Sequence, residues 1–115
     1  MSGMVTYKIF DSQEIAAGGA YTTPALDIAS ANALALHLQS ITGTSPDVTF
    51  TYSLGTDKSG TFVTPASPAT IGANIGAVDV LDFAPEACRY LKITATNNNG
   101  SNAVSLTGVL AVQTN

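Results

Sequence analysis

Apolar and polar side chains alternate at every second position along most of this chain. The clearest run covers residues 48–54, in which valine, phenylalanine, tyrosine and leucine are separated by threonine and serine. Successive side chains of a β-strand point to opposite faces of a sheet, so this run predicts a strand with one buried face. In residues 4–10 the same alternation places Ile9 and Phe10 on opposite faces. Comparable alternation predicts further strands over residues 34–38, 77–83, 88–96 and 103–113.

Turn-forming residues separate these segments. Two glycines at 18–19 predict a turn after the first strand. A polar, glycine-bounded turn at 55–60 predicts that residues 61–64 return as the hairpin partner of the preceding strand. The run Asn-Asn-Asn-Gly-Ser-Asn at 97–102 consists of residues that tolerate positive φ, and it predicts a turn before the last strand.

Three segments are less regular. Residues 21–28 contain Pro24, which cannot donate a ladder hydrogen bond, so they predict an edge strand or a broken one. Residues 65–76, rich in proline, alanine and glycine, predict a long loop with a short strand around Ile71. A helix competes over residues 25–40, which are rich in alanine and leucine and follow a Thr-Pro start. Three leucines spaced by two favour a strand there, and a partial helix stays open.

About eight short strands at regular spacing predict an all-β fold, an antiparallel β-sandwich of jelly-roll-like form. At 115 residues, area scaling buries about 65% of the unfolded surface, enough for one core without disulfides or metals. The sequence shows neither an internal repeat nor a linker. We therefore expect a single domain over residues 1–115.

Charged residues make up only 10% of the chain, while 45% of residues are hydrophobic. Threonine, serine, alanine, glycine and asparagine take the place of the missing charge. A surface so poor in lysine and glutamate indicates a chain that is packed against a partner, including copies of itself. The alternative is an ordinary β domain with a hydroxyl-rich surface.

The charge distribution argues against a nucleic-acid partner, because the net charge is −4 and the four basic residues form no run. These four are Lys8, Lys58, Arg89 and Lys92. The first residues do not place a basic segment before an apolar one, so no signal peptide is expected. No apolar run reaches 18 residues, so no membrane-spanning segment is expected either.

Residues that could carry chemistry are few. His37, the one histidine, alternates with leucines, which indicates a sheet-face or interface residue and not a catalytic base. Cys88, the one cysteine, cannot form an intrachain disulfide and is expected to be a buried structural thiol, as in a protein made in a reducing cytoplasm. One cysteine and one histidine do not make a zinc site. The turn at 57–60 lacks calcium-loop spacing, and Asp79 and Asp82 do not share a strand face. We expect neither an enzyme nor a cofactor.

Two segments resemble known proteins. Residues 83–97, Phe-Ala-Pro-Glu-Ala-Cys-Arg-Tyr-Leu-Lys-Ile-Thr-Ala-Thr-Asn, resemble a proline-led strand of jelly-roll domains. That strand occurs in discoidin-like, galactose-binding modules and in short β-sandwich proteins encoded among the structural genes of tailed phages. Residues 48–64, an alternating strand followed by a Gly-Thr-Asp-Lys-Ser-Gly turn, resemble a hairpin of the same phage proteins.

With its small size and few charges, the chain is similar to the capsid cement (decoration) proteins of tailed bacteriophages. The resemblance implies a structural virion protein that clamps neighbouring subunits of the major capsid protein by non-covalent adhesion. It also implies a homo-oligomer, a dimer or trimer, that is synthesised in the host cytoplasm and located on the capsid surface of the virion. The alternative is a discoidin-like carbohydrate-binding module or a phage fibre accessory domain that uses loop aromatics. Discoidin-like modules are longer and are usually closed by a disulfide.

The residues expected in an interface belong to three segments: the N-terminal strand, the segment broken by proline, and the loop over 65–75. They are Val5, Tyr7, Tyr21, Pro24, Leu26, Pro65, Pro68, Ile71 and Ile75.

Overall fold

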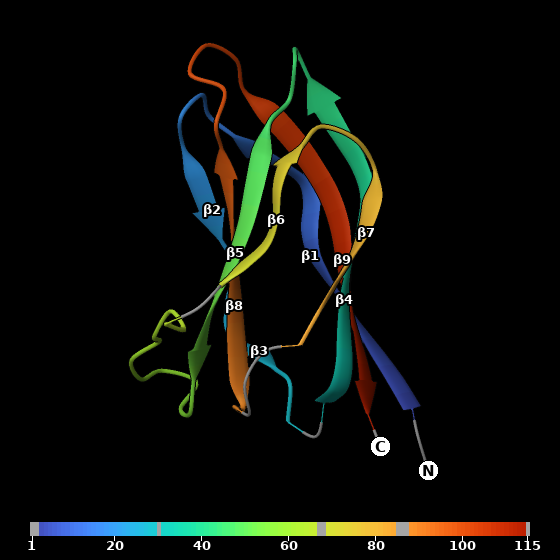
Figure 1. The fold of residues 1–115 in the computed structure, drawn as a ribbon, viewed down its shortest axis with the longest axis vertical. Helices are drawn as coiled ribbons and strands as arrows, with labels where there is room; N and C mark the ends of the chain where they lie inside the picture. The colour runs from blue at the N-terminus through green and yellow to red at the C-terminus, as the bar shows by residue number, and fades with distance from the viewer. Residues whose placement is uncertain (1–2, 30, 67–68, 85–87, 115) are drawn as a thin grey trace.

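The computed structural model describes residues 3–29, 31–66, 69–84 and 88–114. These residues form nine β-strands and no helix, arranged as two antiparallel sheets packed face to face (Figure 1). The predicted all-β sandwich is confirmed. The helix alternative over 25–40 is wrong, because the three leucines all lie buried on the inner face of one strand.

We call the two layers the long sheet and the short sheet. The long sheet has the order β1 (Gly3–Ile15), β9 (Val104–Thr114), β4 (Ala31–Gly43) and β7 (Asp79–Phe83). The short sheet has the order β2 (Ala20–Thr22), β8 (Tyr90–Asn97), β5 (Val48–Gly55) and β6 (Thr70–Ile75), and β3 (Leu26–Asp27) also pairs with β8.

The connectivity of the strands is that of a jelly roll. β2 and β3 pair with the same strand on either side of Pro24, so they act as one broken strand, as predicted. Each sheet then has four positions, and the chain crosses between the sheets at every connection except β5 to β6. Two four-stranded sheets joined in this way constitute the double Greek key of jelly-roll domains.

The core is formed by the inward side of the predicted alternation. β5 and β8 alternate between buried and half-buried positions along nearly their whole length. At the centre the ring of Phe10 lies 5.9 Å from that of Phe50 and 6.0 Å from that of Tyr21. Aromatic contacts at this spacing stabilise a core beyond the area that they bury.

β1 departs from the predicted alternation. Ile9 and Phe10 are both buried, although they are consecutive, and the pairing with β9 shifts register between Lys8 and Phe10. A second shift follows by Gln13, with Ser12 at φ 48°. A β-bulge inserts an extra residue and turns two neighbouring side chains to one face, which alternation alone does not predict.

One further expectation needs correction. Residues 61–64 are not a full hairpin partner of β5, since only Val63 forms a bridge, with Leu54. The same edge of β5 pairs mainly with β6, which is the short strand expected around Ile71 within the predicted 65–76 loop. The turn at 97–102 is present, but no described residue in it has positive φ. Asparagine side chains hold it instead: Asn99 Oδ1 accepts hydrogen bonds from the N–H groups of Ser101 (2.9 Å) and Asn102 (3.1 Å).

Gly43, the last residue of β4, has a conformation that only glycine adopts readily. Its φ is 145°, and a Cβ atom there would lie 2.8 Å from the carbonyl oxygen of Ala103. We expect Gly43→Ala to lower the free energy of unfolding by about 1–3 kcal/mol, measured by urea denaturation. Gly100→Ala is the control, because a Cβ there meets no atom within 4 Å, and its effect should stay within about 0.5 kcal/mol. Equal effects of the two substitutions would contradict this account of Gly43.

Candidate binding groove

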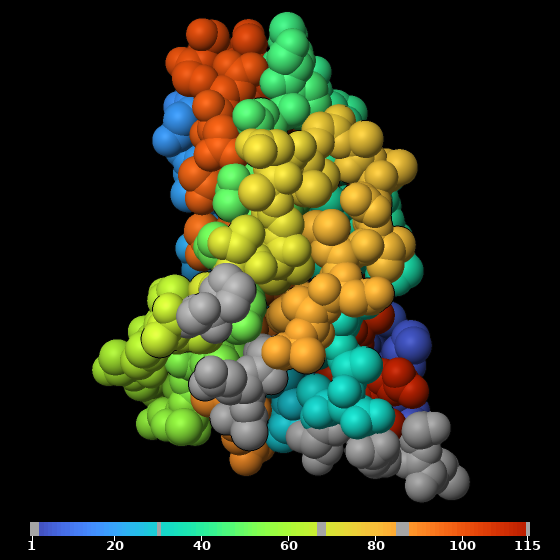
Figure 2. Space-filling model, in the orientation of Figure 1, coloured from blue at the N-terminus to red at the C-terminus, as the bar shows by residue number. Residues whose placement is uncertain are grey.

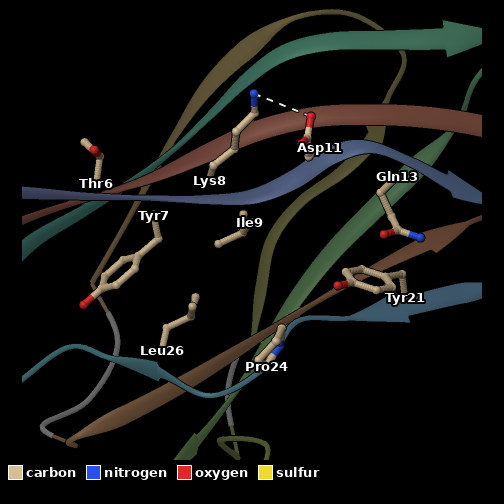
Figure 3. A pocket seen from close by; sticks show the side chains of 9 residues that line it. All are labelled: Thr6, Tyr7, Lys8, Ile9, Asp11, Gln13, Tyr21, Pro24 and Leu26. Atoms are coloured by element: carbon tan, nitrogen blue, oxygen red, sulfur yellow. Dashed lines mark ion pairs between the residues drawn. The ribbon is translucent and has the colours of Figure 1, made fainter.

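The two side edges of the sandwich differ. At one edge β6 lies against β7 (Figure 2), and a Cβ atom at Gly72 would lie 2.9 Å from Leu81 Cδ1. At the other edge a groove of about 520 Å³ lies between β1 and the β2–β3 segment (Figure 3). The residues that line it are Thr6, Tyr7, Lys8, Ile9, Asp11, Gln13, Tyr21, Pro24 and Leu26.

The break at Pro24 shapes one wall of the groove. Pro24 has no N–H, and the backbone is held just before it by Thr23, whose N–H donates to Ile93 O at 2.9 Å. The hydroxyl of Thr23 accepts from the N–H of Ile93 at 3.1 Å and donates to Pro24 O at 3.0 Å. Since Thr23 is buried, these bonds fix the bend rigidly against β8.

The interior of the groove is apolar and its ends are aromatic. Ile9, Pro24 and Leu26 lie between the two walls, with Tyr7 at one end and Tyr21 at the other (Figure 3). Tyr7 Oη donates to Asp27 O at 2.9 Å and so joins the two sheets across the opening. Rings, aliphatic surface and a few polar groups are the components of a binding site for a ligand or a chain segment.

The side chains of Thr6, Lys8 and Asp11 on β1 point away from this interior, whereas Gln13 points toward Tyr21 (Figure 3). Lys8 and Asp11 form an ion pair of 3.5 Å on the far side of the strand, where both side chains are exposed (Figure 3). An exposed pair of this kind contributes little to stability and is easily exchanged for another partner.

The structure brings together four of the nine residues expected in an interface. Tyr7, Tyr21, Pro24 and Leu26 all line the groove, although Leu26 is largely buried at its floor. Val5 lies two residues before Tyr7 on β1 and is 44% exposed.

The other expected interface residues lie elsewhere. Ile71 and Ile75 are half-buried on β6, at the opposite edge of the short sheet, and pack partly against the core. Pro65 is half-buried in the loop before β6. Pro68 lies outside the described residues. The predicted set is therefore divided between two edges.

Several surface residues escaped the sequence prediction. Gln13 lines the groove because β1 continues beyond residue 10 to Ile15. Met4, Val78 and Val80 are large apolar side chains that stand 50–67% exposed on or beside the edge strands of the long sheet. Met4, Val78 and Val80 lie in short alternating runs that predict strands, but alternation does not show which strands lie at the edge of a sheet.

The residues weighed for chemistry lie apart from the groove. His37 is exposed on the outer face of β4. Cys88 is half-buried, and its Sγ donates to Gly55 O at 2.9 Å, which is a structural contact. Asp57 Oδ1 accepts from the N–H of Ser59 at 3.2 Å within its turn. Tyr52 is buried with its ring 5.5 Å from that of Phe83, so it presents no exposed face for sugar stacking.

Neither a metal-binding cluster nor a membrane-spanning helix is found in the part of the chain that the structure describes. There, no three histidine, cysteine, aspartate or glutamate side chains come together as metal ligands would. The same ranges contain no helix that is long and apolar enough to cross a membrane.

Comparison with known proteins shows which solved structures share this fold. No family model and no curated protein sequence matches the chain. The SPBc2 prophage-derived protein YomS matches with a TM-score of 0.61 and 13% identity, over 99% of this chain and 96% of YomS. The VP2 protein of infectious bursal disease virus, from T=1 particles, matches with a TM-score of 0.64 and 17% identity over 98% of this chain.

This chain spans only 32% of VP2, about a third of that protein. A carbohydrate-binding module, CBM36 in complex with calcium and xylotriose, matches with a TM-score of 0.49 and 12% identity, over 93% of this chain and 87% of the module. At these identities the similarity shows the fold alone. The chain is a small jelly-roll-like β-sandwich, related in structure to a prophage-derived protein and to part of a viral VP2.

Proposed function

We propose that this protein is a capsid cement (decoration) protein, a structural component of a virion that adheres to neighbouring subunits of the major capsid protein. The observation that carries the proposal is the exposure of large apolar side chains along both edges of the long sheet. Met4 and Val5 on β1 are 67% and 44% exposed, and Val78 and Val80 at β7 are 62% and 50% exposed. Apolar groups exposed in this way on a sparsely charged surface mark a contact region.

The two apolar edges are placed to contact two neighbours at once. β1 and β7 are the outer strands of the long sheet, three strand spacings or about 14 Å apart. Val5 and Val78 can therefore be covered by different capsid subunits, as a clamp requires. On a symmetric lattice many weak contacts of this kind act together, so adhesion needs neither a deep pocket nor catalysis.

The fold supports the same proposal. A prophage-derived protein matches the sandwich over nearly its whole length, and part of a viral VP2 matches it as well. The protein would be made in the host cytoplasm and would end on the capsid surface, bound to the major capsid protein and to copies of itself.

The test is co-sedimentation with expanded capsids assembled from the major capsid protein encoded in the same genome. We expect wild-type protein to bind, and Val5→Asp and Val78→Asp each to weaken binding by about tenfold or more, because a carboxylate would be desolvated at the contact. Val63→Asp is the matched control, since Val63 is as exposed as Val78 but lies in the loop after β5.

Failure of the wild type to bind expanded capsids would overturn the proposal, as would equal losses in all three variants. The groove favours one other function, because Tyr7 and Tyr21 frame its apolar interior as rings do in many sugar sites. Glycan-array binding that Tyr21→Ala abolishes would favour a carbohydrate-binding module instead.

A further inference from the structure

The outer face of the long sheet is a continuous surface whose composition follows from the strand register. One row across the sheet consists of Lys8, Val109, His37 and Val80. The next row consists of Thr6, Ala111, Ala35 and Asp82. Directly paired residues of neighbouring strands point to the same face, so these eight side chains share one surface. Figure 3 shows Thr6 and Lys8 pointing away from the groove, toward this face.

The centre of this face is small and apolar, and opposite charges lie on its two sides. The central strands β9 and β4 contribute Ala111 and Ala35, which are directly paired and half-buried. Lys8 lies on the β1 side, and Asp82 lies one row away on the β7 side. Lys8, with its ion-pair partner Asp11 beside it, is thus separated from Asp82 by the midline between β9 and β4.

We infer that this face binds the same face of a second copy, which makes the protein a two-fold symmetric dimer. The two-fold axis runs parallel to the strands, along the midline between β9 and β4. It places β1 of each copy over β7 of the other, so Lys8 comes beside Asp82 of the second copy and Ala35 lies over Ala111. A face that carries opposite charges on the two sides of its axis is self-complementary in this arrangement.

Two further observations favour a second copy as the occupant. The strands β1, β9 and β4 are 11 to 13 residues long, so the area of the face is roughly 600 Å², close to the ~800 Å² per partner of a standard interface. Among the residues that the structure describes, the ion-pair partner of Lys8 within one chain is Asp11, at 3.5 Å with both side chains exposed. That pair can be exchanged for Asp82 of the second copy at little cost.

The dimer leaves Val5 and Val78 free for the contacts of the proposed function, whereas Met4 and Val80 face the side that the second copy covers. Val5 points toward the groove side of β1, since the residues of this strand that face outward are Met4, Thr6 and Lys8. Val78 precedes the first paired residue of β7. The inference does not rest on capsid binding, and the oligomeric state is measured without capsids.

The test is analytical ultracentrifugation of the purified chain at concentrations from about 1 to about 100 μM, which detects dissociation constants in the micromolar range. We expect a dimer for the wild type and at least tenfold weaker association for Ala35→Asp, which places a carboxylate at the centre of the face. Thr51→Asp is the matched control, because Thr51 is also half-buried and lies on the outer face of a central strand, in the short sheet. It should remain a dimer, and circular dichroism establishes that both variants are folded.

Charge reversal tests the symmetry itself. Lys8→Asp and Asp82→Lys should each weaken the dimer, since each brings like charges together, and the double variant should restore it. A wild type that is monomeric at about 100 μM or trimeric would overturn the inference. So would a double variant that is no tighter than the single ones, or a Thr51→Asp variant that dissociates as Ala35→Asp does.

Discussion

Replacing Phe10 with alanine is expected to lower the free energy of unfolding by about 3–5 kcal/mol, the range for a large aromatic ring lost from a core. The Phe10 side chain is fully buried, and its ring contacts both Phe50 and Tyr21. The bulge in β1 turns it inward beside Ile9, so the cavity left by truncation would lie at the centre of the sandwich, where relaxation is limited. Urea denaturation monitored by circular dichroism measures the change.

Phe62→Ala is the control for ring size. Phe62 is half-buried in the loop after β5, and its main polar contact is with Lys92, whose Nζ lies 4.3 Å from the ring centroid. Its loss should cost no more than about 1 kcal/mol, as for an exposed cation–π contact. A Phe10→Ala protein that unfolds at the same urea concentration as Phe62→Ala would show that the bulge does not bury Phe10 as described.

Replacing Asn97 with alanine is expected to cost about 3 kcal/mol, because it removes a buried amide that satisfies several backbone groups. The side chain is 1% exposed, and its Nδ2 donates to the carbonyl oxygens of Ile15 (3.2 Å), Ala16 (3.2 Å) and Asn102 (2.9 Å). Its Oδ1 accepts from the N–H of Asn99 at 3.0 Å. One side chain thus joins the end of β1 to the turn between β8 and β9.

Two variants define this prediction further. Asn98→Ala removes an exposed amide with contacts to Asp47 and Thr49, and it should change stability by less than about 1 kcal/mol. Asn97→Asp keeps the shape but replaces the donor with an acceptor that faces the same carbonyl oxygens, so it should be at least as damaging as alanine. If Asn97→Asp retained wild-type stability in urea denaturation, donation by Nδ2 could not be the stabilising contact.

The sequence predicts best those strands that bury one whole face. β5, β8 and β9 each lie between two neighbours, so nearly every inward position is apolar, with Asn97 the buried polar exception, and most outward positions are polar or small. β6 was only partly foreseen, because it is an edge strand in which glycine, alanine and asparagine separate two isoleucines and no residue is fully buried. The bulge in β1 left no trace in the pattern, since Ile9 and Phe10 are apolar whichever way they point.

The surfaces were predicted less completely than the strands. Pro24 predicts a broken strand, which is why Tyr21 and Leu26 are expected in an interface from the sequence. In the structure both residues line the groove. The opposite wall of the groove is β1, and the sequence does not show that β1 lies opposite the segment broken by Pro24, because this depends on how the two sheets pack together. The sequence does not mark Ala35 and Ala111 as interface residues. They become candidates only because the strand register pairs them directly at the centre of the outer face.

The position of β9 has a consequence for how the protein forms. Among the described residues β1 pairs only with β9, and β4 pairs with β9 and the short β7. β1 ends at Ile15 and β9 begins at Val104, so β1 leaves the ribosome before the other described strands and has no partner in its sheet until β9 has been translated. Closing pairs so distant in sequence is slow, on the order of milliseconds to seconds, and a nascent chain that stops before Val104 would keep β1 and its apolar face open to aggregation.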